Sequence, residues 1–286
     1  MIRTTLRILQ RFRSEYSLAH VISYMIAIPY ALIIIIPLYY VFISSFKENA
    51  QIFGSPLSLP NSWDIANYIR AERDIQLFRA MKNSILIVSG SEILILLVGF
   101  PAAYAIARIP GRLSNLFESI FATGFQIPAF ALILPIFLMA AAAGLLFNPI
   151  CLVLFYVASR LPLTVIILAS QMREIPFELE ESATLDGANR LQIMYHIIFP
   201  LARSGFITVL VLNFIGLWNE YLFAFIMLGN ETRTVQVALP YLKGRRIIDF
   251  GLVGAGVVIS VLPVLIFFIV FQERIVKGLL GGGVKG

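Results

Sequence analysis

Apolar residues run along this chain in six stretches of membrane length, and shorter polar segments separate them. A helix crosses the roughly 30 Å hydrocarbon core of a bilayer with about 20 residues. Proline occurs inside several stretches, which membrane helices tolerate when neighbouring helices satisfy the freed carbonyl groups. We therefore expect six packed and kinked transmembrane helices. They are predicted near residues 21–44, 84–107, 119–146, 150–171, 204–228 and 250–271.

The composition agrees with a chain whose main solvent is lipid. Hydrophobic residues make up 59% of the chain, charged residues make up 13%, and the mean hydropathy is +0.88. One soluble domain could not bury so large an apolar fraction. The expected fold class is an all-α integral membrane protein. The first apolar stretch is too long for a signal-peptide core and lacks a small-residue cleavage site, so we expect it to remain as a helix.

Three parts are expected along the chain. Residues 1–20 place arginines every four positions beside apolar residues, a pattern typical of a basic amphipathic helix on the cytoplasmic membrane surface. A frayed tail whose arginines only set the orientation is the alternative. Residues 21–272 form the six-helix domain, with a cytoplasmic loop at residues 173–203. Residues 273–286 form a cytoplasmic tail.

The basic residues indicate the orientation, because Lys and Arg are retained on the cytoplasmic side during insertion. With both termini inside, the inner segments hold twelve basic residues and the outer loops hold nine, with Arg160 within a span. The bias grows when the long outer loop at residues 46–83 is left out, since extended loops translocate largely regardless of charge. We expect a multi-pass membrane protein with both termini in the cytoplasm. The net charge of +6 then reflects topology, and nucleic acid is not needed to explain it.

Residues typical of metal or catalytic chemistry are scarce. Cys151 is the single cysteine of the sequence, so neither a disulfide framework nor a thiolate metal site is expected. His20 and His196 lack the paired spacing of metal ligands. The glycines of residues 281–286 do not form a phosphate-binding loop, because that motif joins a strand to a helix and continues through G-K-[ST]. We expect no catalysis, no cofactor and no metal in this chain, so any energy comes from another polypeptide.

The cytoplasmic loop begins with the pattern of a short acidic helix. Pro176 suits a first helical turn, where the missing N–H costs no hydrogen bond. Negative charges near the start of a helix are stabilised by its dipole. The acidic residues concerned are Glu174, Glu178, Glu180 and Glu181.

A turn and a second helix follow in the same loop. Gly187, after Asp186, supplies the left-handed residue that commonly stops a helix. Asn189 with Gln192 three residues later is typical of a capping box. Two short helices that meet at a glycine would project from the membrane surface. An ordinary solvated acidic linker is the alternative on local composition alone.

The spacing of this loop resembles the signature E-A-A-x-x-x-G, nine residues, I-x-L-P, found in permease subunits of binding-protein-dependent ABC importers. Residues 181–187 read ESATLDG, and residues 197–200 follow as IIFP. Ser182 in place of Ala and Phe199 in place of Leu depart mildly from the signature. The position between two apolar spans is the context that such a motif requires.

The resemblance extends over most of the chain and is closest to the smaller permease subunit of maltose-type carbohydrate importers. Asn83-Ser84, residues 103–108 (AYAIAR), Trp218-Asn219-Glu220 and the C-terminal GVKG carry it. It implies a type I ABC importer permease fold. It also implies a second permease subunit, two ATPase subunits that bind ATP and Mg²⁺, and an extracytoplasmic solute-binding protein.

The resemblance further implies which residues couple this chain to the ATPase. Carried over by position, they are Glu181, Ala183, Asp186 and Gly187. The glycine-rich tail is a further candidate contact. Closure of the ATPases would then reorient the permease helices.

Ionisable residues inside the spans need an explanation, because a charge in the membrane is costly. Glu92, Arg160 and Glu220 are expected at similar depth. A buried Arg160 neutralised by Glu220 or Glu92 is one explanation, and polar groups that line a solute path are the other. Gln126, Tyr156 and Asn219 are further candidates for the path, although each also suits an interhelical hydrogen bond.

The expected solute is a sugar or oligosaccharide, and Arg160 favours an acidic, uronate-containing one. An importer permease for an amino acid, peptide or phosphate ester is an alternative, which the sugar-type tail and Trp218-Asn219-Glu220 disfavour. A self-sufficient secondary transporter would show inverted repeats with broken helices in both halves, and no convincing repeat is present. A membrane-embedded enzyme fits least, since no catalytic constellation occurs.

Overall fold

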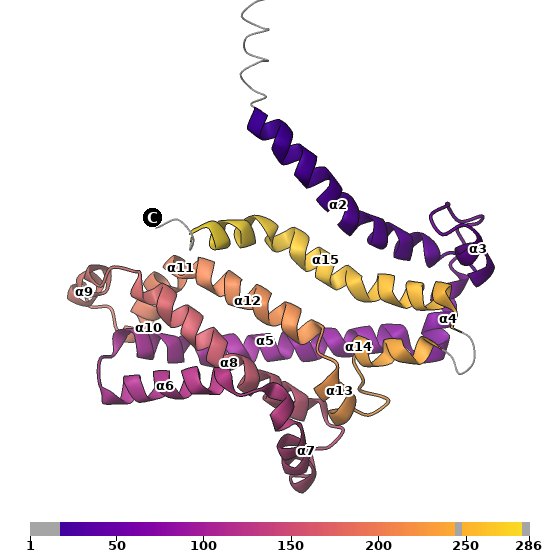
Figure 1. Cartoon of the computed structure of the whole chain (residues 1–286). Helices are drawn as coiled ribbons and strands as arrows, with labels where there is room; N and C mark the ends of the chain where they lie inside the picture. The colour runs from indigo at the N-terminus through magenta and orange to yellow at the C-terminus, as the bar shows by residue number, and fades with distance from the viewer. Residues whose placement is uncertain (1–17, 244–247, 282–286) are drawn as a thin grey trace, which may run out of the picture. The chain divides into compact units, whose positions relative to one another are not determined.

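The computed structural model describes residues 18–243 and 248–281 (Figure 1), and in these ranges the protein is helical without a β-strand. The expected amphipathic helix at residues 1–20 falls almost entirely outside the described residues. The first part of the chain forms α2 (Leu18–Ser44), α3 (Asn49–Gly54), α4 (Ala66–Ile75), α5 (Leu77–Arg108), α6 (Arg112–Gln126), the 3₁₀ turn η1 (Ala129–Leu132), α7 (Ile133–Ala142) and α8 (Pro149–Arg173). The second part forms α9 (Glu178–Leu185), α10 (Arg190–Ile193), the π-helical turn η2 (Met194–Ile198), α11 (Phe199–Leu201), α12 (Arg203–Trp218), α13 (Leu222–Met227), α14 (Val235–Ala238), the 3₁₀ turn η3 (Leu239–Lys243) and α15 (Phe250–Gly281).

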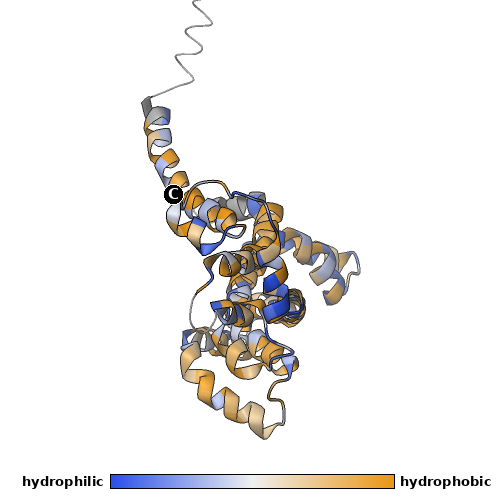
Figure 2. Cartoon of the chain, turned by 90° about the vertical axis from the view of Figure 1, so that its right-hand side faces the viewer, coloured by the Kyte–Doolittle hydropathy of each residue, from blue (hydrophilic) through white to orange (hydrophobic). Residues whose placement is uncertain are grey.

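Four of the described helices are long and apolar enough to cross a bilayer: Ile22–Ser44, Leu77–Arg108, Pro149–Arg173 and Phe250–Gln272. Two bent helix pairs meet the same test when each is counted as one span, and they bring the total to six. Figure 2 shows hydrophobic residues along most of the helical ribbon. Leucine, isoleucine and phenylalanine side chains on these helices remain exposed in the isolated chain. Such a surface requires lipid or partner subunits as its surroundings.

The sequence predicts one kinked span at residues 119–146, whereas the structure has two helices that meet at a sharp bend. The first of them begins earlier, at Arg112, and the pair Arg112–Gln126 and Ala129–Ala142 bends by 93°. The cause is Pro128, which disfavours helical backbone in the residue before it. Ile127 accordingly adopts an extended conformation with ψ of 121°.

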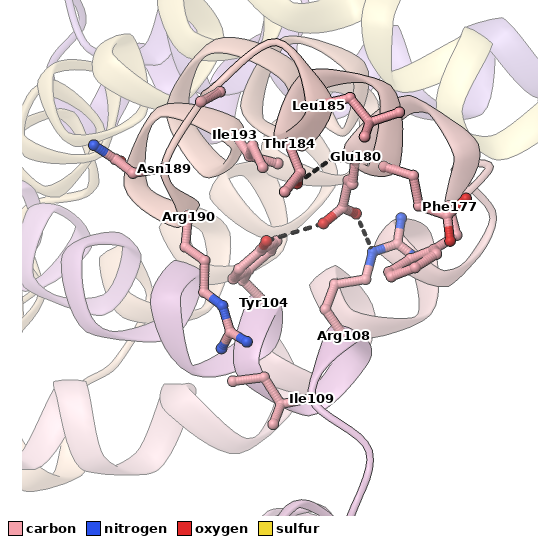
Figure 3. A pocket seen from close by; sticks show the side chains of 12 residues that line it. Tyr104, Arg108, Ile109, Phe177, Glu180, Thr184, Leu185, Asn189, Arg190 and Ile193 are labelled. Atoms are coloured by element: carbon pink, nitrogen blue, oxygen red, sulfur yellow. Dashed lines mark hydrogen bonds and ion pairs between the residues drawn. The ribbon is translucent and has the colours of Figure 1, made fainter.

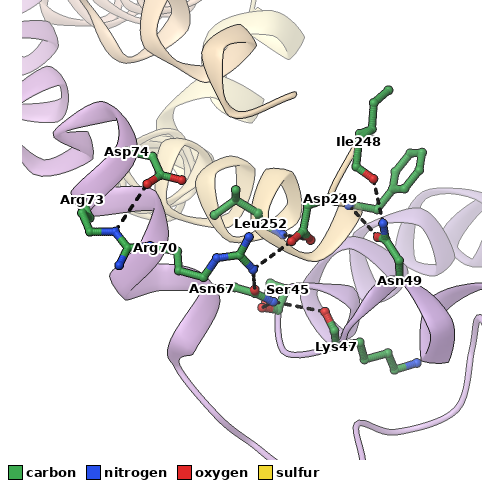
Figure 4. Close-up of polar contacts among 11 residues, drawn as sticks. Ser45, Lys47, Asn49, Asn67, Arg70, Arg73, Asp74, Ile248, Asp249 and Leu252 are labelled. Atoms are coloured by element: carbon green, nitrogen blue, oxygen red, sulfur yellow. Dashed lines mark hydrogen bonds and ion pairs between the residues drawn. The ribbon is translucent and has the colours of Figure 1, made fainter. Parts of the chain in front are cut away.

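The polypeptide divides into two compact units. The first comprises residues 1–71 and 243–258, and the second comprises residues 72–242 and 259–286. In the first unit, the amide of Asn67 donates hydrogen bonds to the carbonyls of Ser45 and Lys47 at 3.0 and 3.1 Å. Arg70 forms an ion pair of 2.8 Å with Asp249 (Figure 4). Through α4, these contacts join the chain after α2 to the start of α15.

In the second unit, α5 packs along α8, and α12 contacts both helices. Gly99 permits the close approach of α5 to α8, since a Cβ there would lie 3.0 Å from the Thr164 methyl group. The core between these helices contains Phe100, whose ring centroid lies 4.9 Å from that of Phe206. Phe199 of α11 packs on Phe206 at 4.7 Å. The loop after α8 is thereby anchored on the spans that it connects.

Candidate coupling corner and membrane cavity

The corner between α9 and α10 is closed by backbone hydrogen bonds. Gly187 has a φ of +87°, a conformation that glycine adopts without steric cost. Its N–H donates to the Thr184 carbonyl at 3.0 Å, and the N–H of Ala188 donates to the Ala183 carbonyl at 2.9 Å. This pair of bonds is the Schellman motif, which satisfies the carbonyls left free at the end of a helix. The predicted stop at Asp186-Gly187 is confirmed.

The second helix starts with the predicted capping box. The Asn189 side chain accepts a hydrogen bond of 2.9 Å from the Gln192 N–H, and the Gln192 side chain accepts one of 2.8 Å from the Asn189 N–H. Both groups would otherwise be unsatisfied at the helix start. From α10 the chain passes through η2 into the core at Ile198, which is fully buried. Residues 178–193 are called the coupling corner below.

The coupling corner presents most of its predicted coupling residues to solvent. Glu181, Asp186 and Gly187 are exposed, whereas Ala183 is half-buried and packs against the core of the second unit. Leu185 lies between them in the chain, and 89% of its surface is exposed. A single exposed apolar side chain is common on protein surfaces, so Leu185 is singled out by its place at the turn and not by its exposure alone. Sequence reasoning did not select Leu185, although its place one residue before Asp186-Gly187 was a usable signal.

The sequence pattern also did not predict a separate role for Glu180. Below the corner lies a cavity of about 650 Å³ lined by residues of α5, α9 and α10. Glu180 points from α9 toward Tyr104 and Arg108 at the end of α5 (Figure 3). The sequence pattern predicts that Glu180 is one of several exposed acidic residues near the start of this helix, but its side chain is only 6% exposed. The available signal was its helical spacing of three residues from Ala183, which places both on one face.

A second cavity, of about 480 Å³, lies within the membrane-spanning part of the second unit. Tyr156, Arg160 and Glu220 line it together with aromatic rings that include Phe130 and Phe155. The hydroxyl of Tyr156 donates a hydrogen bond of 2.7 Å to Oε2 of Glu220. Three of the predicted pathway residues therefore meet at one cavity. Aromatic faces with a few polar groups are a combination suited to binding an organic solute.

Glu220 does not lie inside a continuous span, and the expected span at residues 204–228 is wrong in this respect. Helix α12 ends at Trp218, and α13 begins at Leu222. The carboxylate of Glu220 accepts hydrogen bonds from the N–H groups of Phe223 and Ala224 at 2.8 and 3.0 Å. Glu220 thus satisfies the start of α13. A separate bend, of 75°, lies before α12, between Arg190–Leu201 and Arg203–Trp218.

The other three pathway candidates lie outside this cavity's lining. Gln126 is exposed and donates a hydrogen bond of 3.3 Å to the Ala122 carbonyl. Asn219 is exposed and donates to the Ile215 carbonyl at 2.9 Å. Glu92 is only 5% exposed, and its carboxylate interacts with Asn213 and Arg160.

Arg160 makes no close ion-pair contact with Glu220 or Glu92 within residues 18–243 and 248–281, although its charge interacts with the Glu92 carboxylate at longer range. The guanidinium group lies over Gly216 of α12. A Cβ at Gly216 would approach the Arg160 Cζ to 2.7 Å, so only glycine leaves room for this placement. The buried ion pair of the second unit is instead the one between Arg108 and Glu180.

Comparison with known proteins identifies relatives over nearly the whole chain. The chain is 36% identical to the diacetylchitobiose uptake system permease protein NgcG of Streptomyces coelicolor, over 89% of this chain and 85% of that protein. It is 35% identical to the trehalose/maltose transport system permease protein MalG of Thermococcus litoralis, over 91% of this chain and 95% of that protein.

The fold is shared with a bacterial ABC transporter involved in the import of the acidic polysaccharide alginate. That structure matches with a TM-score of 0.78 and 26% identity, over 90% of this chain and 98% of its own. The predicted all-α, type I importer permease fold is confirmed. The model of the family described as "Binding-protein-dependent transport system inner membrane component" matches residues 95–280. The chain belongs to this family of multi-pass inner-membrane permease subunits of ABC importers.

Proposed function

We propose that this chain is one of two permease subunits of an ATP-driven importer that moves a sugar or oligosaccharide across the bacterial inner membrane. A binding protein outside the cytoplasm delivers the solute. Two separate ATPase subunits bind ATP and Mg²⁺ and hydrolyse the nucleotide, and this chain performs no catalysis. The observation that carries the proposal is the coupling corner, a rigid turn at Gly187 with an exposed leucine and exposed acidic residues.

The proposed mechanism is alternating access driven from the cytoplasmic side. Each ATPase holds one coupling corner through residues that include Glu181, Leu185 and Asp186. Closure of the ATPases around ATP moves the corner, and the attached helices turn the solute path from the inside to the outside. The geometry supports this transfer, because α10 and α11 continue from the corner directly into the packed core around Phe100 and Phe206. A packed core transmits movement with little deformation.

Carbohydrate as the solute class rests on the relatives and on the membrane cavity. The printed names of the two relatives refer to diacetylchitobiose and to trehalose and maltose, and the matching structure imports a polysaccharide. In this chain, aromatic rings and the polar groups of Tyr156, Arg160 and Glu220 share one cavity. Rings stack on sugar faces, and polar groups fix the hydroxyls. An amino acid, peptide or phosphate ester as solute is the alternative.

An acidic sugar is the finer proposal for the solute. Arg160 lines the cavity and makes no close ion-pair contact within the described ranges, so its guanidinium group can also meet a solute carboxylate. Uptake of alginate oligosaccharides and of maltose by cells carrying Arg160→Ala tests this point. The acidic preference requires a larger loss for the alginate oligosaccharides. Equal losses for both sugars would exclude it.

The orientation proposed from the basic residues puts both termini and the coupling corner in the cytoplasm. A cysteine introduced at Asp186 in a Cys151→Ser background should react with a membrane-impermeant maleimide only in inverted vesicles. Reaction from the outside of intact spheroplasts would contradict the orientation and the coupling role together.

Purification from the native host tests the proposed assembly. The tagged chain should bring along an ATPase and a second membrane subunit, and proteoliposomes of the complex with its binding protein should take up sugar only with ATP. The bent helix pairs are also compatible with a self-sufficient transporter. Uptake by the purified chain alone would favour that alternative.

A further inference from the structure

Glu180 connects the coupling corner to a helix that lies far away in the sequence. Glu178 and Glu181 of α9 face solvent, whereas the Glu180 carboxylate is buried against the end of α5. Its Oε1 lies 2.5 Å from Nε of Arg108, and its Oε2 accepts a hydrogen bond of 2.9 Å from the Tyr104 hydroxyl. Both partners come from successive turns of one helix face, four residues apart (Figure 3).

Arg108 also contacts the residues just before α9. Its Nη2 donates a hydrogen bond of 2.8 Å to the Ile175 carbonyl, and its guanidinium group lies 5.9 Å from the ring centroid of Phe177. Its side chain is only 8% exposed. The last turn of α5 is therefore held to the start of α9 by an ion pair, two hydrogen bonds and a cation–π contact. We call Tyr104, Arg108 and Glu180 the α5 latch.

The contacts of the α5 latch are costly to separate. Separating a buried ion pair leaves uncompensated charges in a poorly solvated place, and this costs more than separating apolar side chains. Hydrogen bonds to charged groups are also directional. Apolar contacts, by contrast, are non-directional. A displacement of α9 should therefore move the end of α5 with it.

Covalent connections cannot provide this link. Helix α9 joins α8 through residues 174–177 and joins α12 through α10 and α11, whereas Tyr104 and Glu180 are 76 residues apart in the chain. Without the α5 latch, movement of the corner would reach α5 only through side-chain packing. Helix α5 forms the most extensive helix contact of the second unit, along α8.

We propose that Tyr104, Arg108 and Glu180 are positioning residues that transmit the movement of the coupling corner to α5. The proposal rests on the proposed function, because it requires an ATPase that moves the corner. It assigns the coupling of α5 to a buried ion pair, in addition to the exposed residues that contact the ATPase. The three residues do not themselves bind nucleotide or solute.

The test uses the whole complex, purified with its partner subunits and reconstituted with its binding protein. Glu180→Gln keeps the shape of the side chain and removes its charge, and Tyr104→Phe removes only the hydroxyl. ATP hydrolysis and uptake are measured together, with diacetylchitobiose, trehalose, maltose and alginate oligosaccharides as probes. Glu174→Gln, an exposed glutamate outside the coupling corner, is the matched control.

We expect both latch variants to keep hydrolysing ATP while the sugar imported per ATP falls. Glu180→Gln should lower this ratio by roughly tenfold, the factor that corresponds to loss of one charged hydrogen bond. Glu174→Gln should match the wild type. An unchanged ratio in both latch variants would overturn the inference. Should Glu180→Gln fail to assemble, Tyr104→Phe decides by the same ratio, with a smaller decrease expected.

The two proposals fail in different ways. If the wild-type complex imports none of the probes with ATP, the proposed carbohydrate function is contradicted. If the wild type imports a probe and the latch variants import it with the same yield per ATP, only the role of the α5 latch is contradicted. A reduced amount of assembled complex with an unchanged ratio would likewise assign the α5 latch to stability alone.

Discussion

The Tyr156 hydroxyl on α8 donates a hydrogen bond of 2.7 Å to the Glu220 carboxylate, across 64 residues of sequence. The same carboxylate accepts the first free N–H groups of α13. One acidic side chain therefore fixes a helix start and ties it to a neighbouring span. Glu220 thus satisfies backbone N–H groups at a break in the membrane helix. The same residue lines the cavity that also contains Tyr156 and Arg160.

Replacing Glu220 should therefore destabilise the protein mainly because N–H groups at the start of α13 lose their acceptor, and less because a charge is removed. Glu220→Ala should cost about 1–3 kcal/mol, because buried donors lose their acceptor. Glu220→Gln retains one acceptor oxygen and should cost less. Thermal unfolding in detergent gives the comparison. Asn219→Ala, next to it but bonded only within its own helix, serves as the control and should unfold near the wild-type temperature.

Backbone conformation, and not lack of space, should decide which side chains position 187 tolerates. A Cβ at Gly187 would meet no atom within 4 Å. Gly187→Val should cost roughly 1–3 kcal/mol of local strain at the φ of +87°. Gly187→Asn should be tolerated better, since Asn adopts this region more readily. We expect Gly187→Val to remain in the membrane but to lose uptake. Membrane insertion and sugar uptake are the measurements.

Gly187→Asp separates charge from strain at the same position. Asp and Asn have the same shape, so a loss of coupling confined to Gly187→Asp would arise from the added negative charge beside Asp186. We expect that variant to be inserted and to hydrolyse ATP without matching uptake. Normal uptake at normal expression would contradict the coupling role of Gly187.

Leu185 should contribute binding energy to the ATPase and little to folding. Burying a leucine side chain stabilises a complex by about 1.5–3 kcal/mol. Leu185→Ser should therefore weaken co-purification of the ATPase by at least about tenfold, while the unfolding temperature of the isolated chain stays near that of the wild type. The exposed neighbour Ser182 supplies the control as Ser182→Ala. Full retention of the ATPase by Leu185→Ser would place the contact elsewhere on the corner.

Gly216 should control the position of the Arg160 guanidinium group. A methyl group at Gly216 would overlap that group, so Gly216→Ala should displace it and reduce uptake in the same direction as Arg160→Ala. Gly90 on α5 is the control, because a Cβ there would contact nothing within 4 Å. Gly90→Ala should leave uptake unchanged and stabilise its helix by roughly 0.5–1 kcal/mol. Normal uptake by Gly216→Ala would show that the placement of Arg160 over α12 is unimportant.

Local sequence rules predicted the coupling corner in detail. Asp186-Gly187 and the pair Asn189 and Gln192 act through hydrogen bonds that span only a few residues, so the pattern contains nearly all the information needed. Hydropathy likewise predicted the continuous spans, because lipid imposes their length. The break at Ile127-Pro128 escaped prediction, since a membrane helix can either keep or break its axis at proline.

Long-range partners explain the remaining differences. The burial of Glu180 depends on Tyr104 and Arg108, more than 70 residues earlier in the chain. Nothing in the local pattern distinguishes it from the exposed acids around it. Glu220 presented a similar problem, because a charge within an apolar stretch resembles a solute ligand, whereas here it also satisfies the start of α13.

The hydrogen-bonded turn at Gly187 has a consequence for how the transporter is put together. Its backbone groups are already satisfied within the permease, so the docking shape exists before any soluble subunit arrives. Association then loses little conformational entropy at this point. If the corner binds an ATPase as proposed, the membrane subunit can be synthesised first and present a finished template to its partners.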